Sequence, residues 1–391
     1  MTTTHPFYRE LAQLMRDTLP DLPHTARKRL IGFVLGILLA GTIVLSRIAS
    51  AQAGFCGGSV TGESHERRLR RIEDDPFLTW QDTYAPAVRR VLNWKRAKRL
   101  LILIDETGHT DWVRVLTAAI WYRGRAVPLA WVQWQAQCPL AVSYWVLVDR
   151  LLAMVASIVP ANVEVVVIGD RAFGNPQFTD RVEAYGWKWL VRLQSQTCFR
   201  DRQGRRWQAS QVLTQPGGRW KGQGQLFKKS GWRAASLVAF WDHHHREPLL
   251  LASNLAPSWE LIQLYLCRGA IECLFRDWKS KGWQWESSQV RDLAHSERLL
   301  LGLAWATLVV LCLGNQVAQE VLAQPPKPRR TPPRIGKRSL FALGRERLQG
   351  RLYNTVQTPA RWELEEFEAP TWEQQVYFHH ARAYVFAPSR V

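Results

Sequence analysis

Three acidic residues stand where the chain could bring carboxylates together. Asp105 and Asp170 each follow a run of apolar residues, so each should emerge at the edge of a sheet from a buried strand. Glu272 lies farther along, in a segment with a helical pattern. Three such carboxylates would repel one another, and divalent ions relieve that repulsion. The three acids therefore predict a site for two Mg²⁺ ions, with Mn²⁺ as a substitute, and such a pair can activate water to cut a phosphodiester.

The helical segment around Glu272 carries a stripe of polar side chains. At about 100° per residue, five of them fall within an arc of roughly 80°, and apolar residues fill the opposite arc. A glutamate in such a stripe is ordinarily a surface salt-bridge partner, and a strand that ends in Asp is common, so neither feature alone identifies a site. Together they predict that the cations of the stripe grip phosphates next to the metal ions. The stripe consists of Tyr265, Arg268, Glu272, Arg276 and Lys279.

The same stripe carries a resemblance to a known family. From Tyr265 to Lys279 the chain reads Tyr-x2-Arg-x3-Glu-x6-Lys, which resembles the signature of bacterial cut-and-paste DDE transposases of the insertion-sequence-four family. Ile104-Asp-Glu-Thr107 resembles the first Asp motif of that family, and Ile168-Gly-Asp-Arg-Ala-Phe-Gly174 resembles the second. The similarity covers residues 99 to 310.

This resemblance implies a ribonuclease-H-like core in which the three acids bind the metal ions. It implies that Tyr265, Arg268 and Lys279 contact the DNA backbone near the cut, and that Tyr265 binds rather than attacks. It also implies a homodimer on paired transposon ends, with a DNA hairpin as an intermediate. A hairpin needs a displaced base on which a tryptophan could stack. Trp220 and Trp232, each beside a basic residue, are the candidates, and a hydrophobic anchor of a small β domain is the alternative for each.

The elements that must position these residues follow an α/β pattern. From residue 99 to 193 the order is three strands, helix, strand, helix, strand, which predicts a mixed sheet. Residues 195 to 247 are rich in Gly, Gln, Trp and Arg with short alternating pieces, and predict a small antiparallel β insertion. Long helices are expected at Ser258–Lys281 and Ser296–Val321. The other expected elements are strands at Arg99–Asp105, Trp112–Trp121, Ala126–Trp134, Val163–Asp170, Trp187–Leu193 and Leu249–Ala252, and helices at Val142–Ile158 and Phe178–Tyr185.

The first 95 residues look helical, and basic residues crowd two of the expected helices. This indicates either a helical DNA-binding domain or solvated helix faces. The expected helices are Phe7–Leu19, Thr25–Ala51, Glu63–Ile72 and Ala85–Lys98. The predicted organisation is a helical DNA-binding domain (1–95), the first part of the catalytic core (96–194), the β insertion (195–247), the second part of the core (248–323), and a linker with a C-terminal region (324–391). The linker, at 324–337, is rich in Pro and Arg.

Composition narrows the class of protein. A hydrophobic content of 47% excludes a largely disordered chain. Lys and Arg total 52 against 33 Asp and Glu, a net charge of +19 that fits a polyanionic partner, because each neutralised phosphate releases counterions. The six cysteines form no CxxC pair and indicate reduced thiols in a cytoplasmic protein. The run His243–His245 favours a solvated turn over a metal site.

Two apolar stretches, Leu30–Leu45 and Leu299–Gly314, raise the question of a membrane. Each has about 16 residues, which is shorter than a bilayer span requires, so buried core helices are expected and no membrane partner. The sequence thus predicts a transposase that cuts transposon terminal inverted repeats and joins them to target DNA. The open alternatives are a catalytically inactive DNA-end-binding protein, a metal-dependent nuclease without strand transfer, and a membrane protein.

Overall fold

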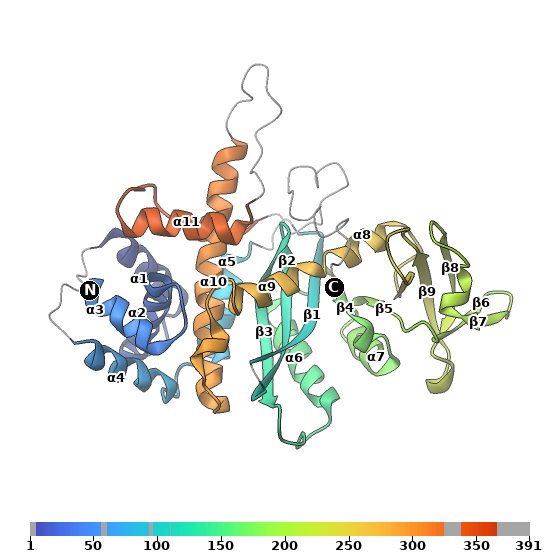
Figure 1. Ribbon diagram of the computed structural model, residues 1–391, viewed down its shortest axis with the longest axis horizontal. Coiled ribbons are helices and arrows are strands. Elements are labelled where there is room, and N and C mark those ends of the chain that lie inside the picture. The colour runs from blue at the N-terminus through green and yellow to red at the C-terminus, as the bar shows by residue number, and fades with distance from the viewer. Residues whose placement is uncertain (1–4, 56–60, 94–96, 110, 324–337, 366–391) are drawn as a thin grey trace, which may run out of the picture.

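The backbone forms one long mixed sheet with a group of helices at one end (Figure 1). The computed structural model describes residues 5–55, 61–93, 97–109, 111–323 and 338–365. The expected linker at 324–337, the C-terminal region after 365, and Cys56, Lys95 and Arg96 lie outside the described residues. Ten strands are hydrogen-bonded in the order β3-β2-β1-β4-β5-β10-β9-β8-β6-β7. The strands are β1 (Arg99–His109), β2 (Val113–Tyr122), β3 (Arg125–Gln135), β4 (Glu164–Gly169), β5 (Lys188–Arg192), β6 (Cys198–Asp201), β7 (Arg206–Gln208), β8 (Arg219–Leu226), β9 (Arg233–Phe240) and β10 (Leu249–Ser253).

Eleven α-helices of the described chain surround this sheet or pack beside it. They are α1 (Pro6–Thr18), α2 (His24–Ala40), α3 (Leu45–Phe55), α4 (Gly62–Glu73), α5 (Ala85–Val91), α6 (Tyr144–Ile158), α7 (Pro176–Glu183), α8 (Glu260–Leu266), α9 (Gly269–Trp278), α10 (Leu293–Leu322) and α11 (Leu340–Leu352). A π-helical turn at Trp80–Tyr84 precedes α5. Helix α11 was not expected from the sequence. The α/β class and the mixed sheet are as predicted.

Strand β1 carries the first acid between two differently paired neighbours. It runs parallel to β4 from Arg99 to Ile104 and antiparallel to β2 as far as His109. The predicted strand end at Asp105 is therefore too early, because β2 keeps pairing with β1 after β4 has stopped. Apolar residues fill β1 and β4 because parallel strands are buried on both faces. Since Ile104 pairs with Gly169, Asp105 and Asp170 follow directly at the same edge of this strand pair.

The antiparallel strands β6 to β9 lie where the insertion was expected, but they do not form a separate sheet. Strand β10 pairs antiparallel with β5 on one side and with β9 on the other, so the insertion extends the central sheet. Figure 1 shows the sheet continuing from β5 into β9 and β8. This continuity depends on the pairing of distant segments, which the local sequence pattern does not record.

Two expected helices in the first hundred residues are shorter than predicted. The segment Thr25–Ala51 is not one helix, because Gly41 adopts a left-handed conformation (φ 64°) that ends α2. Helices α2 and α3 then meet at 91°. The helix expected at Ala85–Lys98 ends at Val91, because Leu92 turns to an extended conformation and bridges to Leu364.

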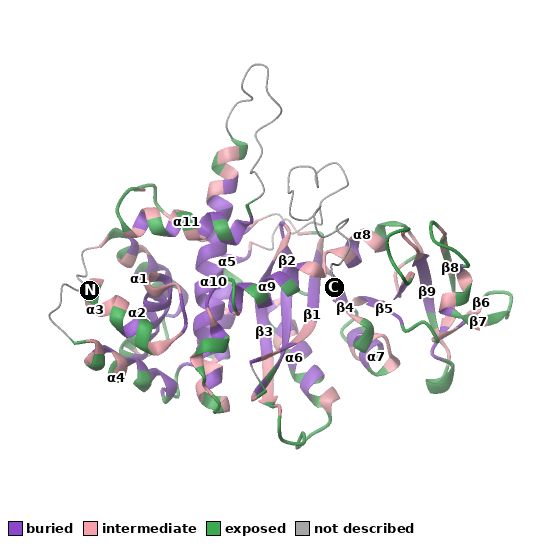
Figure 2. Ribbon diagram, viewed as in Figure 1, coloured by how far each residue is buried: buried purple, intermediate pink, exposed green. Residues whose placement is uncertain are grey.

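Helix α10 lies between the N-terminal helices and the sheet and packs against both. It contacts α2 and α4 on one side and β3 on another, and α11 crosses it. Figure 2 shows α10 buried along most of its course. By length and composition it could cross a membrane, but 94% of its most apolar stretch is buried inside the protein. The expected buried core helix at Leu299–Gly314 is thus confirmed.

The helix expected at Ser258–Lys281 is divided into α8 and α9, and α9 is fixed against α10. The indole Nε1 groups of Trp278 and Trp283 both donate to the Thr307 hydroxyl, each at 3.1 Å. Beside them Asp277 forms a buried ion pair with Arg125 of β3 at 3.2 Å. These contacts hold α9 across β1, β2 and β3 (Figure 1).

Candidate functional site

One arginine joins two of the three predicted acids. Arg268 donates from Nη1 to Asp105 Oδ2 at 2.7 Å, and its Nη2 contacts Glu272 Oε1. The side chains of Arg268 and Asp105 are 18% and 17% exposed, whereas that of Glu272 is 48% exposed. Residues that are 163 positions apart in sequence, Asp105 and Arg268, therefore meet through a largely buried ion pair.

The third acid lies at the end of the neighbouring strand. Asp170 directly follows β4, and its Oδ1 accepts a hydrogen bond from the Ala172 N–H at 2.8 Å, which caps the short 3₁₀ turn Arg171–Phe173. No shared hydrogen bond with Asp105 or Glu272 is recorded for Asp170. Its charge nevertheless acts on Asp105, as the pKa of Asp105 shows.

The pKa of Asp105 depends both on the burial of its carboxyl group and on the charges around it. Burial raises the pKa of Asp105 to about 6, against the stabilising effects of Arg268 and of a hydrogen bond from the Glu106 N–H. The charges of Asp170 and Glu272 raise it further. The three acids thus influence one another, and the guanidinium of Arg268 compensates part of their repulsion.

The turn between α8 and α9 places Arg268 at this position. Four N–H groups of the turn bond to the carbonyl three residues earlier, a tighter winding than an α-helix: Cys267 to Leu264, Arg268 to Tyr265, Ala270 to Cys267, and Ile271 to Arg268. The extra winding breaks the 100° rotation on which the predicted stripe depended. Tyr265 is consequently 7% exposed, whereas Glu272 lies at the surface.

The other residues of the stripe lie in α8, in α9 and directly after α9. Burial raises the pKa of Tyr265, and Arg268 and Arg192 lie close enough to lower it in part. Arg276 donates to the Cys273 sulfur at 3.0 Å. Lys279 follows the last residue of α9, and its Nζ lies 3.4 Å from Glu286. The structure thus brings Arg268 to the acids, and it places Arg276 in α9 and Lys279 directly after the end of that helix.

A fourth carboxylate near the site was missed by the sequence analysis. Glu106 follows Asp105, and side chains alternate along a strand, so it points to the α6 face of the sheet. There it hydrogen-bonds Tyr144 and lies 3.7 Å from Arg114. Burial raises the pKa of Tyr144, and the charges of Glu106, Asp170 and Asp105 raise it further. Only the alternation next to Asp105 could have indicated Glu106, and no local signal marks Tyr144.

The two tryptophan candidates both contact neighbouring side chains of the insertion. Trp220 packs edge-on against Phe199 at 5.5 Å between ring centres. The guanidinium of Arg200 lies 4.4 Å from the centre of the Trp232 ring, and Arg206 lies 5.6 Å from it. A third tryptophan, Trp259, is 37% exposed and was not singled out from the sequence.

The acids offer a metal ion suitable atoms, but in the described chain they do not surround one point. No group of three His, Cys, Asp or Glu side chains among the described residues is arranged to hold a metal ion. The hard carboxylate oxygens of Asp105, Asp170 and Glu272 match the preference of Mg²⁺ and Mn²⁺. Burial is the main cause of the raised pKa of Asp105, and the charges of Asp170 and Glu272 add to it, so a cation at these acids would be stabilised. The three carboxylates therefore fit a divalent ion by their chemistry. In this structure the guanidinium of Arg268 pairs with two of them, Asp105 and Glu272.

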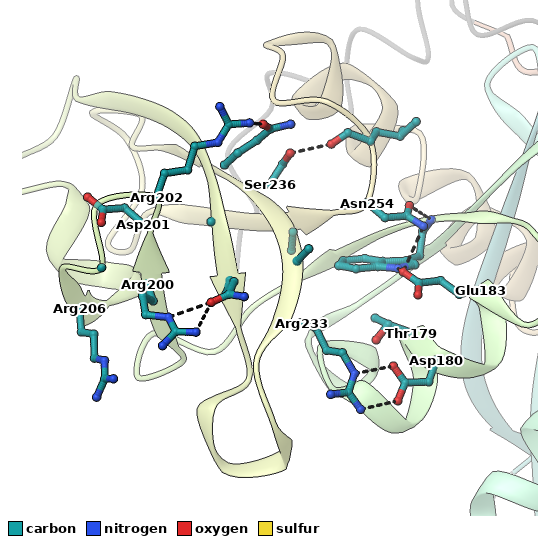
Figure 3. Close-up of a pocket in the computed structure, with 18 residues that line it drawn as sticks. Thr179, Asp180, Glu183, Arg200, Asp201, Arg202, Arg206, Arg233, Ser236 and Asn254 are labelled. Atoms are coloured by element: carbon teal, nitrogen blue, oxygen red, sulfur yellow. Dashed lines mark hydrogen bonds and ion pairs between the residues drawn. The ribbon is translucent and has the colours of Figure 1, made fainter.

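A cavity of about 980 Å³ lies away from these acids, between α7 and the insertion. Figure 3 shows Arg233 pairing with Asp180 across it, at 3.1 and 3.2 Å. Trp189 of β5 lines it and donates to Glu183 at 2.8 Å. Alternation along β5 places Trp189 and Arg192 on opposite faces of the sheet, and Arg192 acts on Tyr265. None of the predicted site residues lines this cavity.

Comparison with known proteins gives one family match. Residues 144–309, which make up less than half of the chain, match the family described as "Transposase DDE domain". The match includes Asp170 and Glu272. The search of curated proteins found no match. Among solved structures, the chain is similar to the piggyBac transposase in a synaptic complex with hairpin DNA, with a TM-score of 0.44 and 10% identity over 99% of this chain and 84% of that one.

The family match supports a DDE transposase, an enzyme that acts on DNA. Domains of this family generally use divalent metal ions. The structural similarity is too low to carry an argument about function.

Proposed function

We propose that this protein is a cut-and-paste DNA transposase of the insertion-sequence-four type, with Asp105, Asp170 and Glu272 as its metal-binding acids. The observation that supports it most directly is that the three acids lie close enough for their charges to affect one another, with Arg268 paired to two of them. Asp105 and Asp170 follow the paired parts of the neighbouring strands β1 and β4, and Glu272 lies on α9, which packs on β1. Asp170 and Glu272 also lie within the matched DDE domain.

In this proposal the three acids would hold two divalent ions, Mg²⁺ or Mn²⁺. When bound, such ions activate water and stabilise the attacking and leaving oxygens of a phosphodiester. Arg268, Arg276 and Lys279 would bind DNA phosphates beside the cut. The hydroxyl of Tyr265 would bind the DNA backbone rather than attack it, because metal-activated water supplies the nucleophile and no covalent protein intermediate is needed.

The proposal extends to the organisation of the chain. Residues 96–194 and 248–323 would form a ribonuclease-H-like core, with residues 195–247 as its β insertion. Residues 1–95 would be the DNA-binding domain, and residues 324–391 a linker and C-terminal region. The protein would act in the bacterial cytoplasm as a homodimer on two terminal inverted repeats before joining target DNA. A hairpin intermediate would use Trp220 or Trp232 to stack on a displaced base.

The test compares DNA binding and DNA cleavage on the same substrate. Short inverted repeats that bracket the coding region supply the end sequences, and a labelled duplex with such an end is incubated with protein in Mg²⁺ or Mn²⁺. Asp105→Asn and Glu272→Gln should each lower the cleavage rate by at least about 100-fold, because metal ligands are lost. Both variants should still shift the duplex in a gel. Glu346→Gln, which changes an acid of an exposed ion pair with Arg338, is the matched control and should cleave normally.

Three outcomes would contradict the proposal in different ways. Wild-type protein that binds ends without nicking them would be an inactive end-binding protein. Cleavage without joining of pre-cut ends to a target plasmid would indicate a nuclease without strand transfer. Cleavage at the wild-type rate by Asp105→Asn would remove the metal site itself from the mechanism.

A further inference from the structure

Arg268 occupies the space between two acids of the candidate metal site. Its two terminal nitrogens engage two different carboxylates, Nη1 with Asp105 and Nη2 with Glu272. A guanidinium is a planar, permanently charged fork, so it can join two carboxylates that would otherwise repel. Because the side chains of Arg268 and Asp105 are each less than a fifth exposed, water screens the attraction between them only weakly.

The neighbouring cations do not duplicate this contact. Lys279 pairs with Glu286 at 3.4 Å, and Arg276 donates to the sulfur of Cys273. Arg114 pairs with Glu106, on the opposite face of the sheet from Asp105. Arg268 forms ion pairs with both Asp105 and Glu272.

A divalent ion would bind the same two carboxylates that Arg268 now contacts, so it would bring a second positive charge beside a largely buried guanidinium. Repulsion between the two cations favours release of the Arg268 contacts. Arg268 would then lose two charged acceptors while remaining mostly buried, which is costly for a cation. A DNA phosphate beside the site can accept the same paired N–H groups, so it offers Arg268 a replacement.

We propose that Arg268 is a positioning residue that exchanges partners: it holds Asp105 and Glu272 in the metal-free protein, and it transfers to a DNA phosphate when a divalent ion binds. The inference rests on the proposed function and deepens it, because metal and DNA would then each favour the binding of the other. Such coupling is reciprocal and typically amounts to ~5- to 150-fold in affinity. The free protein would bind metal weakly and would gain a complete site only on DNA.

The test measures Mn²⁺ affinity directly, through the electron paramagnetic resonance signal of unbound Mn²⁺, with the full chain at pH 8. Each titration is run without DNA and with a duplex that carries a terminal repeat, after subtraction of Mn²⁺ bound by the duplex alone. Wild-type protein should bind Mn²⁺ at least ~5-fold more tightly with the duplex. Without DNA, Arg268→Gln should bind Mn²⁺ more tightly than wild type does. Addition of the duplex should raise the Mn²⁺ affinity of this variant by less than ~2-fold.

Three further variants make the result decisive. Arg233→Gln removes an arginine that pairs with Asp180, outside the proposed metal and DNA site, and it should behave like wild type. Arg268→Lys keeps the charge without the fork, and it should give an intermediate Mn²⁺ affinity in the absence of DNA. Asp105→Asn should weaken Mn²⁺ binding in every condition, and circular dichroism confirms that each variant is folded.

The outcomes separate the inference from the proposed function. Weaker Mn²⁺ binding by folded Arg268→Gln, or an equal DNA effect in Arg268→Gln and wild type, would overturn the exchange of partners while leaving the metal site intact. Unchanged Mn²⁺ binding by Asp105→Asn would overturn the proposed metal site, whatever Arg268 does.

Discussion

The contact between α10 and α11 depends on two glycines that each face the backbone of the other helix. A Cβ atom added at Gly344 of α11 would lie 1.9 Å from the carbonyl oxygen of Val310, and one added at Gly314 of α10 would lie 2.0 Å from that of Leu340. Ordinary Cβ contacts begin at 3.4 Å. Gly344→Ala therefore forces the two helices apart by about 1.5 Å, the difference between 3.4 and 1.9 Å.

The expected loss of stability combines two destabilising effects with one smaller stabilising effect. Overpacking of this kind costs about 1–3 kcal/mol, and no rotation of a side chain can relieve a clash with a backbone oxygen. Separation of the helices would also weaken the packing of Leu340 and Phe341, which are each 4% exposed. Alanine recovers about 1 kcal/mol because it favours a helix more than glycine does. We expect Gly344→Ala to lower the free energy of unfolding by about 2 kcal/mol.

The assay is urea unfolding of wild type and variants, followed by far-ultraviolet circular dichroism. Gly32→Ala is the matched control, since Gly32 is also inside a helix but an added Cβ there meets no atom within 4 Å. This control should gain about 0.5–1 kcal/mol from helix propensity. The close contact between the helices predicts that Gly344→Ala lowers the free energy of unfolding, whereas Gly32→Ala raises it. If Gly344→Ala also stabilised the protein, the geometry of the α10–α11 contact would be wrong.

Three further predictions concern buried polar groups. Burial raises the pKa of Glu297 from its ordinary 4.5 to about 7, so its contribution to stability is complete below about pH 4.5 and is lost as the pH rises through about 7. The free energy of unfolding of Glu297→Gln should therefore equal that of wild type near pH 4.5 and should be about 2–3 kcal/mol larger than that of wild type at pH 8. Equal stability of the two proteins at both pH values would contradict this. Thr307→Val removes the acceptor of two buried indoles and should cost about 2 kcal/mol in urea unfolding, with a changed near-ultraviolet tryptophan spectrum; an unaltered midpoint would argue against the shared hydroxyl. Asp277→Ala leaves Arg125 without its buried partner and should cost about 3–5 kcal/mol, whereas adding Arg125→Met should restore part of that loss; equal stability of the single and double variants would show that the pair is not coupled.

The polar stripe on the Glu272 helix shows where a local pattern is informative and where it fails. The residue types and their spacing correctly indicated a charged surface beside Glu272 and an apolar side that packs on the body of the protein. The pattern assumed one uninterrupted helix, but the tight turn around Arg268 separates α8 from α9. Tyr265 is buried as a result, and Arg268 reaches Asp105 instead of solvent.

The sequence by itself determined the strands, most of the helices, and the two acids that follow the apolar runs of β1 and β4. These features are local, because burial leaves its record in the alternation and length of apolar segments. Only the tertiary structure decided that the insertion continues the central sheet, that α11 closes on α10 through facing glycines, and that Arg268 stands between Asp105 and Glu272. Each of these depends on which distant segments meet, and such a meeting is set by packing of the whole chain rather than by the residues on either side.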